Sequence, residues 1–156
     1  MAKITPFLWF DKEAEEAARF YVSVFPNSKL GRITYHGEAG PGPVGSVLLV
    51  EFELDGEPFM ALNGGPGFPF TQAVSFSIDC KTQAEVDHYW SKLLEGGGSE
   101  IQCGWLKDRY GLSWQVVPEA LPRLLHDPDP ARAKRVMEAM MKMVKLDVAA
   151  LEAAAA

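Results

Sequence analysis

The segment QAVSFSIDCKTQAEVDHYWSKLLEGGG, residues 72–98, contains one strand followed by one helix, and this order decides how the rest of the chain is interpreted. Residues 72–79 alternate apolar with small polar side chains, as a half-buried strand does. Thr82 and Glu85 have the spacing of a capping box, and the glycines at 96–98 end the helix that follows. Three short strand-like stretches come next, at residues 99–103, 104–108 and 112–117.

The same order of elements occurs once before in the chain. Residues 3–10, KITPFLWF, predict a strand, and Asp11 is the expected cap of a helix that runs to Phe25. Three strand-like stretches then follow, at residues 29–36, 46–54 and 58–63. The aromatic pairs Phe20-Tyr21 and Tyr89-Trp90 lie at equivalent places, about 69 residues apart, which indicates an internal duplication.

This duplication predicts an α+β fold in which two βαβββ modules share a single domain covering residues 1–156. The modules are expected at residues 1–66 and 70–118, with their sheets side by side around a shared cleft. C-terminal helices are expected over residues 119–154. Residues 131–144 in particular have a broad, methionine-rich apolar face with helical spacing. That face is expected to pack on the sheets or on a second copy, and a homodimer is favoured because closed two-fold pairs are the commonest oligomers.

Composition and charge exclude several classes of partner. The chain has 156 residues and a formal net charge of −6, which disfavours nucleic acid and an anionic membrane surface as partners. No apolar run approaches the roughly 20 residues that a membrane span requires. Cys80 and Cys103 are too few for a disulfide framework, so a cytoplasmic location is expected.

Four segments carry a resemblance to a known family, and the resemblance extends over nearly the whole chain. They resemble the PhnB-like branch of the vicinal-oxygen-chelate superfamily, also called the glyoxalase/bleomycin-resistance superfamily. Many such sequences bear the label 3-demethylubiquinone 3-methyltransferase. The resemblance implies paired βαβββ modules, in agreement with the duplication, and its most specific part is the third segment. The segments are ITPFLWFDKEAEEAARFY (4–21), FMALNGGPGF (59–68), CGWLKDRYGLSWQVVP (103–118) and AMMKMVKLD (139–147).

The resemblance also implies where a metal would be bound. Superfamily enzymes hold a divalent ion through His, Gln or Glu on the first strand, Glu on the fourth, His on the fifth and Glu on the eighth. The matching residues here are Thr5 or Pro6, then Ala61, Ala73 and Gln115. Because a metal site needs three or four protein ligands and Gln115 alone offers a neutral oxygen, we predict no metal and no other cofactor.

Other chemistry-bearing residues have simpler interpretations. We expect structural or solvated roles for the three histidines, including His36, and a solvated turn for Lys107-Asp108-Arg109. The GxGxxG pattern at 40–45 has prolines that donate no N–H, and a strand rather than a helix follows it, so no nucleotide is expected there. Cys103 is either an unreactive thiol, buried or at a sheet edge, or a nucleophile. Glu51 and Glu53 share a strand face that is expected to be solvated.

The expected ligand site is a largely apolar cleft with a few neutral polar groups. On the fourth strand Phe59, Ala61 and Asn63 are expected to face the cleft, whereas on the first strand the register is open between Phe7 with Trp9 and Leu8 with Phe10. On the fifth and eighth strands the expected cleft residues alternate with core residues. The predicted ligand-binding set is Trp9, Phe59, Asn63, Ser75, Ser77, Cys103 and Gln115.

These features favour a metal-independent protein that binds a small neutral or aromatic molecule in the cleft. Two alternatives stay open. The first is an enzyme of the same superfamily (a lyase, dioxygenase or methyltransferase-like protein) that uses the same cleft or Cys103. The second is a structural or regulatory module whose cleft is filled by its own side chains.

Overall fold

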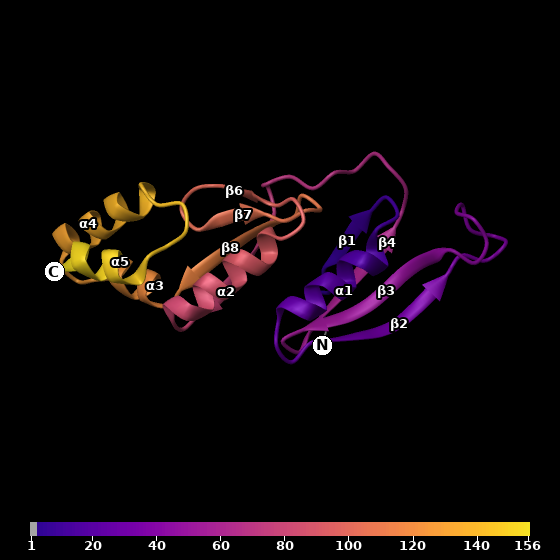
Figure 1. Ribbon diagram of the computed structural model, residues 1–156, viewed down its shortest axis with the longest axis horizontal. Coiled ribbons are helices and arrows are strands. Elements are labelled where there is room, and N and C mark those ends of the chain that lie inside the picture. The colour runs from indigo at the N-terminus through magenta and orange to yellow at the C-terminus, as the bar shows by residue number, and fades with distance from the viewer. Residues whose placement is uncertain (1–2) are drawn as a thin grey trace. The chain divides into compact units, whose positions relative to one another are not determined.

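The computed structural model describes residues 3–156 and divides into two compact units, which meet in the sequence at Pro69 and Phe70. Each unit contains one four-stranded sheet with one long helix on it (Figure 1). The expectation of an α+β fold with two βαβββ modules and a helical C-terminal extension is therefore confirmed. Among the described residues, no helix has the length and hydropathy to cross a membrane.

The first unit has the element order β-α-β-β-β. Its sheet has the strand order β1-β4-β3-β2, in which β1 is parallel to β4 and the other pairs are antiparallel. The elements are β1 (Phe7–Phe10), α1 (Ala14–Val24), β2 (Lys29–Tyr35), β3 (Val47–Leu54) and β4 (Glu57–Asn63).

The core of the first unit lies between α1 and one face of this sheet. Tyr21 of α1 is fully buried and stacks on Phe52 of β3, with 6.3 Å between ring centroids. Leu8 and Phe10 are buried in β1, whereas Phe7 is 58% exposed. The register of the first strand is thereby decided: Leu8 and Phe10 face the helix, and Trp9 lies on the opposite, open face of the sheet.

The prediction that Asp11 caps α1 is wrong. The structure begins α1 at Ala14, and the backbone N–H of Ala14 donates to Oδ1 of Asn63, at 2.8 Å. Asn63 is the last residue of β4, so the cap comes from a strand 49 residues away along the chain rather than from Asp11. A side-chain oxygen at this place satisfies one of the free N–H groups at a helix start.

The second unit repeats this arrangement. Its sheet has the order β5-β8-β7-β6, with β5 parallel to β8. The predicted capping box is confirmed in part: Oγ1 of Thr82 accepts from the Glu85 N–H at 3.2 Å, while the Glu85 carboxylate accepts from the N–H of Lys81. The elements are β5 (Ser75–Cys80), α2 (Gln83–Leu94), β6 (Ser99–Glu100), β7 (Trp105–Lys107) and β8 (Ser113–Pro118).

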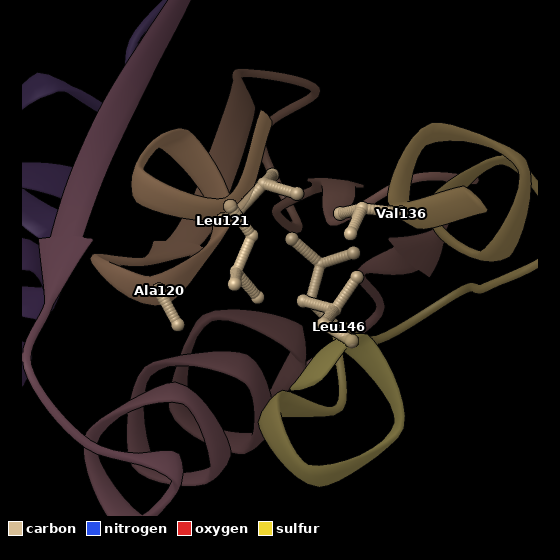
Figure 2. Packing of buried hydrophobic residues seen from close by; sticks show 6 residues of the cluster. Ala120, Leu121, Val136 and Leu146 are labelled. Atoms are coloured by element: carbon tan, nitrogen blue, oxygen red, sulfur yellow. The ribbon is translucent and has the colours of Figure 1, made fainter. Parts of the chain in front are cut away.

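Three further helices form a small core of their own at the end of the second unit. They are α3 (Ala120–Leu125), α4 (Pro130–Met141) and α5 (Val148–Ala155). Leu121, Val136 and Leu146 converge between them (Figure 2). The buried members of this cluster are Ala120, Leu121, Leu124, Val136, Leu146 and Leu151. The extension therefore folds on itself within the second unit.

The predicted helix over residues 131–144 is three residues too long. It ends at Met141, and the carbonyls of Met143 and Val144 accept from the N–H groups of Cys103 and Gly104, both at 2.8 Å. The last predicted turn is thus replaced by pairing with the chain that leads into β7. Met137 and Met141 of α4 remain 41% and 62% exposed, so the expected burial of the methionine face is only partial.

Gln83 ties the extension to α2. Its side-chain amide donates to the carbonyl of Leu146 at 3.1 Å and accepts from the N–H of Val148 at 2.7 Å. The ammonium of Lys145 lies 2.8 Å from the carboxylate of Asp87 and keeps the pKa of Asp87 below its ordinary value. These contacts attach the start of α5 to the first turns of α2.

The expectation of a solvated turn between β7 and β8 is wrong for Asp108. It is only 3% exposed, and its carboxylate accepts from the N–H groups of Tyr110 and Leu112 and from Nε1 of Trp114, at 2.8–3.1 Å. Three donors around one carboxylate fix both the turn and the indole of β8. Asp108 therefore has a structural role within the segment CGWLKDRYGLSWQVVP.

We predict that Asp108→Ala destabilises the protein by about 3 kcal/mol, because it leaves buried donors without an acceptor. Urea unfolding followed by tryptophan fluorescence measures this change. Asp79→Ala, which removes an exposed carboxylate from the same unit, is the control and should change stability by less than about 0.5 kcal/mol. An equal, small effect of both substitutions would show that Asp108 does not hold the turn.

Candidate functional site

The open face of the second sheet carries a row of neutral polar side chains. Trp114 and Val116 of β8 are buried on the α2 face, so the alternate residues Ser113 and Gln115 lie on the opposite face. In register, Ser75 is opposite Ser113, and Ser77 is opposite Gln115. The sequence-based prediction of which residues share this face agrees with the structure.

Within this row the polar groups bond to one another. Nε2 of Gln115 donates to Oγ of Ser75 at 3.0 Å, which leaves the Gln115 carbonyl oxygen without a bond to the chain in the described residues. Oγ of Ser113 is fully buried and has no partner in residues 3–156. We call Ser75, Ser77, Ser113 and Gln115 the polar row.

Two side chains from β7 extend the polar row, and neither was assigned to the site from the sequence. Trp105 lies opposite Gln115, and Lys107 lies opposite Ser113. Trp105 adds a half-buried aromatic side chain next to the row. Lys107 belongs to β7 and not to the turn where it was expected to be solvated, so the face also carries one cation.

On the first sheet, the expected orientation of Phe59 and Asn63 is wrong. Phe59 stacks on Phe52 at 5.4 Å between centroids, and Phe52 in turn stacks on Tyr21 of α1. The side chain of Asn63 bonds to the N–H of Ala14 and to the carbonyl of Val47. Ala61 lies between Phe59 and Asn63 on the same face of β4, and it is fully buried. The open face of β4 therefore presents Met60 and Leu62, not Phe59 and Asn63.

This register changes which residues lie at the positions where the resemblance places metal ligands. Ala61 faces α1, and its neighbours on the open face, Met60 and Leu62, offer no metal-binding atom that suits a hard divalent ion. Ala73 lies in the turn before β5, two residues before Ser75. No cluster of three or more His, Cys, Asp or Glu side chains exists among residues 3–156. The residues present do not fit the implied metal, and the absence of a metal stays a prediction.

The paired carboxylates of β3 are neutralised by β2. Glu51 lies 3.2 Å from Arg32, and Glu53 lies 3.8 Å from Lys29. All four side chains are substantially exposed. The two carboxylates therefore form surface ion pairs, which agrees with the expectation of a solvated strand face.

The two cysteines have different surroundings, and they are not joined to each other. Cys80 is fully buried, and burial, together with the charges of Glu85 and Asp79, raises the pKa of its thiol to about 12. Cys103 is half-buried and adopts a positive φ of 60°. It immediately precedes Gly104, whose carbonyl accepts from the N–H of Val116 in β8. Cys103 therefore lies one residue from a backbone hydrogen bond to β8, the strand that carries Gln115 of the polar row.

A pocket of about 720 Å³ lies within the first unit, and the sequence did not indicate it. It is formed where β1 and β4 end, beside the start of α1 and the loop between β2 and β3. Trp9 and Leu62 line it from the sheet, and Asp11 and Glu15 line it from the helix side. Its other lining residues are Lys12, His36, Pro41, Gly42, Pro43, Ser46, Val47, Leu48, Asn63, Gly64 and Gly65.

His36 is the unusual group in this pocket. It is 7% exposed, and Nδ1 of its imidazole is buried without a hydrogen-bond partner in the described part of the chain. A buried polar atom without a partner is uncommon in folded proteins. The expectation of an ordinary structural or solvated histidine therefore does not describe His36.

The comparisons with known proteins agree with this fold. The 3-demethylubiquinone-9 3-methyltransferase family model matches residues 2–117, so the chain belongs to this family. It is a PhnB-like member of the vicinal-oxygen-chelate superfamily. The matched region ends before α3, so the three C-terminal helices lie outside it. A search of curated proteins gave no significant match.

Solved structures include similar chains. A PhnB protein from Bacillus cereus is 37% identical, with a TM-score of 0.68, over 75% of this chain and 99% of its own. A Pseudomonas aeruginosa protein at 23% identity, with a TM-score of 0.63, covers 76% of this chain and 98% of its own. The fosfomycin resistance protein FosX from Listeria monocytogenes shares the fold, with 13% identity and a TM-score of 0.59. The match covers 78% of this chain and 94% of the FosX chain.

We predict that Cys103 reacts with iodoacetamide at pH 8 and that Cys80 does not. With a pKa of about 12, only about one Cys80 thiol in ten thousand is ionised at pH 8, and the thiolate is the reactive form. This fraction grows only as the pH rises towards 12. Peptide mapping after timed alkylation measures both sites, and Cys103→Ser is the control that should stay unlabelled until urea is added. Early labelling of Cys80 in the folded protein would contradict its burial.

Proposed function

We propose that this chain is a small-molecule-binding protein that works without a metal ion, and that its ligand contacts the open face of the second sheet. The observation that supports this most directly is the polar row. Ser75, Ser77 and Gln115 present neutral donors and acceptors beside the aromatic ring of Trp105. Neutral hydrogen-bonding groups beside an aromatic side chain are typical of small-molecule sites.

Charge supports a neutral ligand for this face. A buried anion without a cationic partner is costly, and Ser75, Ser77 and Gln115 carry no charge. Trp105 offers an aromatic surface for a flat molecule. Lys107 is the one feature that favours an anion instead, so a phosphorylated ligand is the competing outcome. From the expected site, Ser75, Ser77, Cys103 and Gln115 are retained for this face, whereas Trp9 belongs to the first unit.

Enzymatic activity within the same superfamily is the alternative, because the matching family is described by a methyl-transfer reaction. Such a reaction needs a site for a methyl donor. The Gly-rich loop at 40–45 is a weak candidate: β3 follows it instead of a helix, and Pro41 and Pro43 have no N–H to donate. Transfer of a methyl group from an added sulfonium methyl donor to a panel of phenols, detected by mass spectrometry, would establish this alternative over simple binding.

We further propose a cytoplasmic homodimer. The unbonded cysteines fit a reducing compartment. Met137, Met141 and Val144 leave apolar surface exposed on and after α4, which a second copy of the chain would cover. Light scattering over a dilution series from high to low micromolar concentration should give twice the 17.2 kDa chain mass. A constant mass of one chain would overturn the dimer.

We predict that Gln115→Leu weakens the binding of duroquinone by about 1–3 kcal/mol. Duroquinone is a neutral, planar quinone with two carbonyl acceptors. The physical reason is that a ligand oxygen loses the second N–H of the Gln115 amide, the one that is not bonded to Ser75. Titration calorimetry measures the change. Binding to the unaltered protein should be the same before and after treatment with a chelator, as a metal-independent site requires.

The matched control is Gln102→Leu, which makes the same change at an exposed residue of the same unit. It should leave duroquinone binding unchanged. Tighter binding of glucose 6-phosphate than of duroquinone, or no effect of Gln115→Leu on any binder, would show that the ligand assignment is wrong.

A further inference from the structure

The pocket of the first unit has the features of a built site. Its volume of about 720 Å³ falls within the range of small-molecule pockets, which is roughly 300–1,000 Å³. Every residue that lines it lies between Trp9 and Gly65, so it shares no residue with the polar row, whose members lie between Ser75 and Gln115.

His36 is held rigidly in the wall of this pocket. Its backbone N–H donates to the carbonyl of Ser46 at 2.7 Å, and its carbonyl accepts from the N–H of Gly45 at 2.9 Å. The loop between β2 and β3 then packs on the ring: a Cβ on Gly42 would lie 2.5–2.7 Å from three of its atoms, and one on Gly40 would lie 3.0 Å from Nδ1. The backbone of the loop thus packs closely against the imidazole and leaves no room for side chains at these two glycines.

This fixed imidazole has an unused hydrogen-bonding capacity. Neither ring nitrogen bonds to any group in residues 3–156, although the side chain is more than nine-tenths buried. A neutral imidazole always has one nitrogen that accepts a hydrogen bond, whichever nitrogen carries the proton. A ligand that donates a hydrogen bond would therefore satisfy a group that the chain itself leaves unsatisfied.

Trp9 provides a fixed aromatic wall. Its Nε1 donates to the carbonyl of Gly65 at 2.9 Å, and the ring of Phe68 contacts it edge-on, with 5.0 Å between centroids. The glycine at 64 is also required, because a Cβ there would lie only 2.2 Å from the indole. The orientation of the indole is set before any ligand arrives, which lowers the cost of binding a flat molecule.

Charge around the pocket disfavours an anion. Asp11 and Glu15 contribute two carboxylates, and Lys12 contributes the one Lys or Arg side chain among the lining residues. Glu15 is paired with Arg19 at 2.8 Å. With acceptors in excess, the pocket suits a ligand that donates hydrogen bonds.

We propose that this pocket is a second small-molecule site, which binds a planar aromatic molecule through Trp9 and accepts a hydrogen bond from its hydroxyl group at His36. The proposal is independent of the function proposed for the polar row.

The test compares two probes that differ only in the donor: 2-naphthol and 2-methoxynaphthalene. Calorimetry should show that the full-length protein binds 2-naphthol at least about tenfold more tightly, because the ether cannot donate to His36. His36→Phe should remove this preference, and His36→Gln, which keeps an acceptor, should restore part of it. The indole N–H resonance of Trp9, assigned with Trp9→Phe, should shift when 2-naphthol is added.

Gln115→Leu is the control that separates this proposal from the previous one, and it should leave 2-naphthol binding unchanged. Equal binding of the two probes, tighter binding of 2-naphthyl phosphate, or failure of 2-naphthol to bind would each overturn the proposal. If thermal unfolding shows that His36→Phe does not fold, the comparison of the two probes and the Trp9 resonance still decide the matter.

Discussion

The carboxylate of Asp108 is the constraint on which the polar face of the second sheet depends. It binds the indole N–H of Trp114 and two N–H groups of the turn between β7 and β8. Because these bonds hold Trp114 on the α2 face, the alternation of a strand fixes Ser113 and Gln115 on the other face. A charged group that was expected in solvent therefore decides which residues of β8 lie on the open face of the sheet.

The two units use one architecture in different ways. In the second unit the open face of the sheet carries Ser75, Ser77 and Gln115, whereas in the first unit Met60 and Leu62 occupy β4. The polar group that distinguishes the first unit is His36, which comes from the end of the β2–β3 hairpin and not from a central strand. Duplication has thus preserved the fold, and the chemistry differs between the two copies.

The C-terminal extension gives the second unit a second core. Leu146 is fully buried and packs so closely on Gly104 that a Cβ there would lie 2.8 Å from it. Gln83 bonds to the backbone on both sides of Asp147, at Leu146 and Val148. The extension therefore supports the chain that enters β7, beside the polar row, although it lies outside the region that the family model matches.

The sequence by itself determined the duplicated βαβββ order, the capping box of α2 and the two faces of β8, because Trp114 and Val116 alternate with polar Ser113 and Gln115. It could not decide the faces of β4, where Phe59 and Ala61 alternate with equally apolar Met60 and Leu62, so only packing against Tyr21 and Phe52 fixed them. The cap of α1 by Asn63 and the enclosure of His36 by Gly40 and Gly42 join residues brought together by folding. Such contacts are decided only by the tertiary structure, because no local periodicity encodes them.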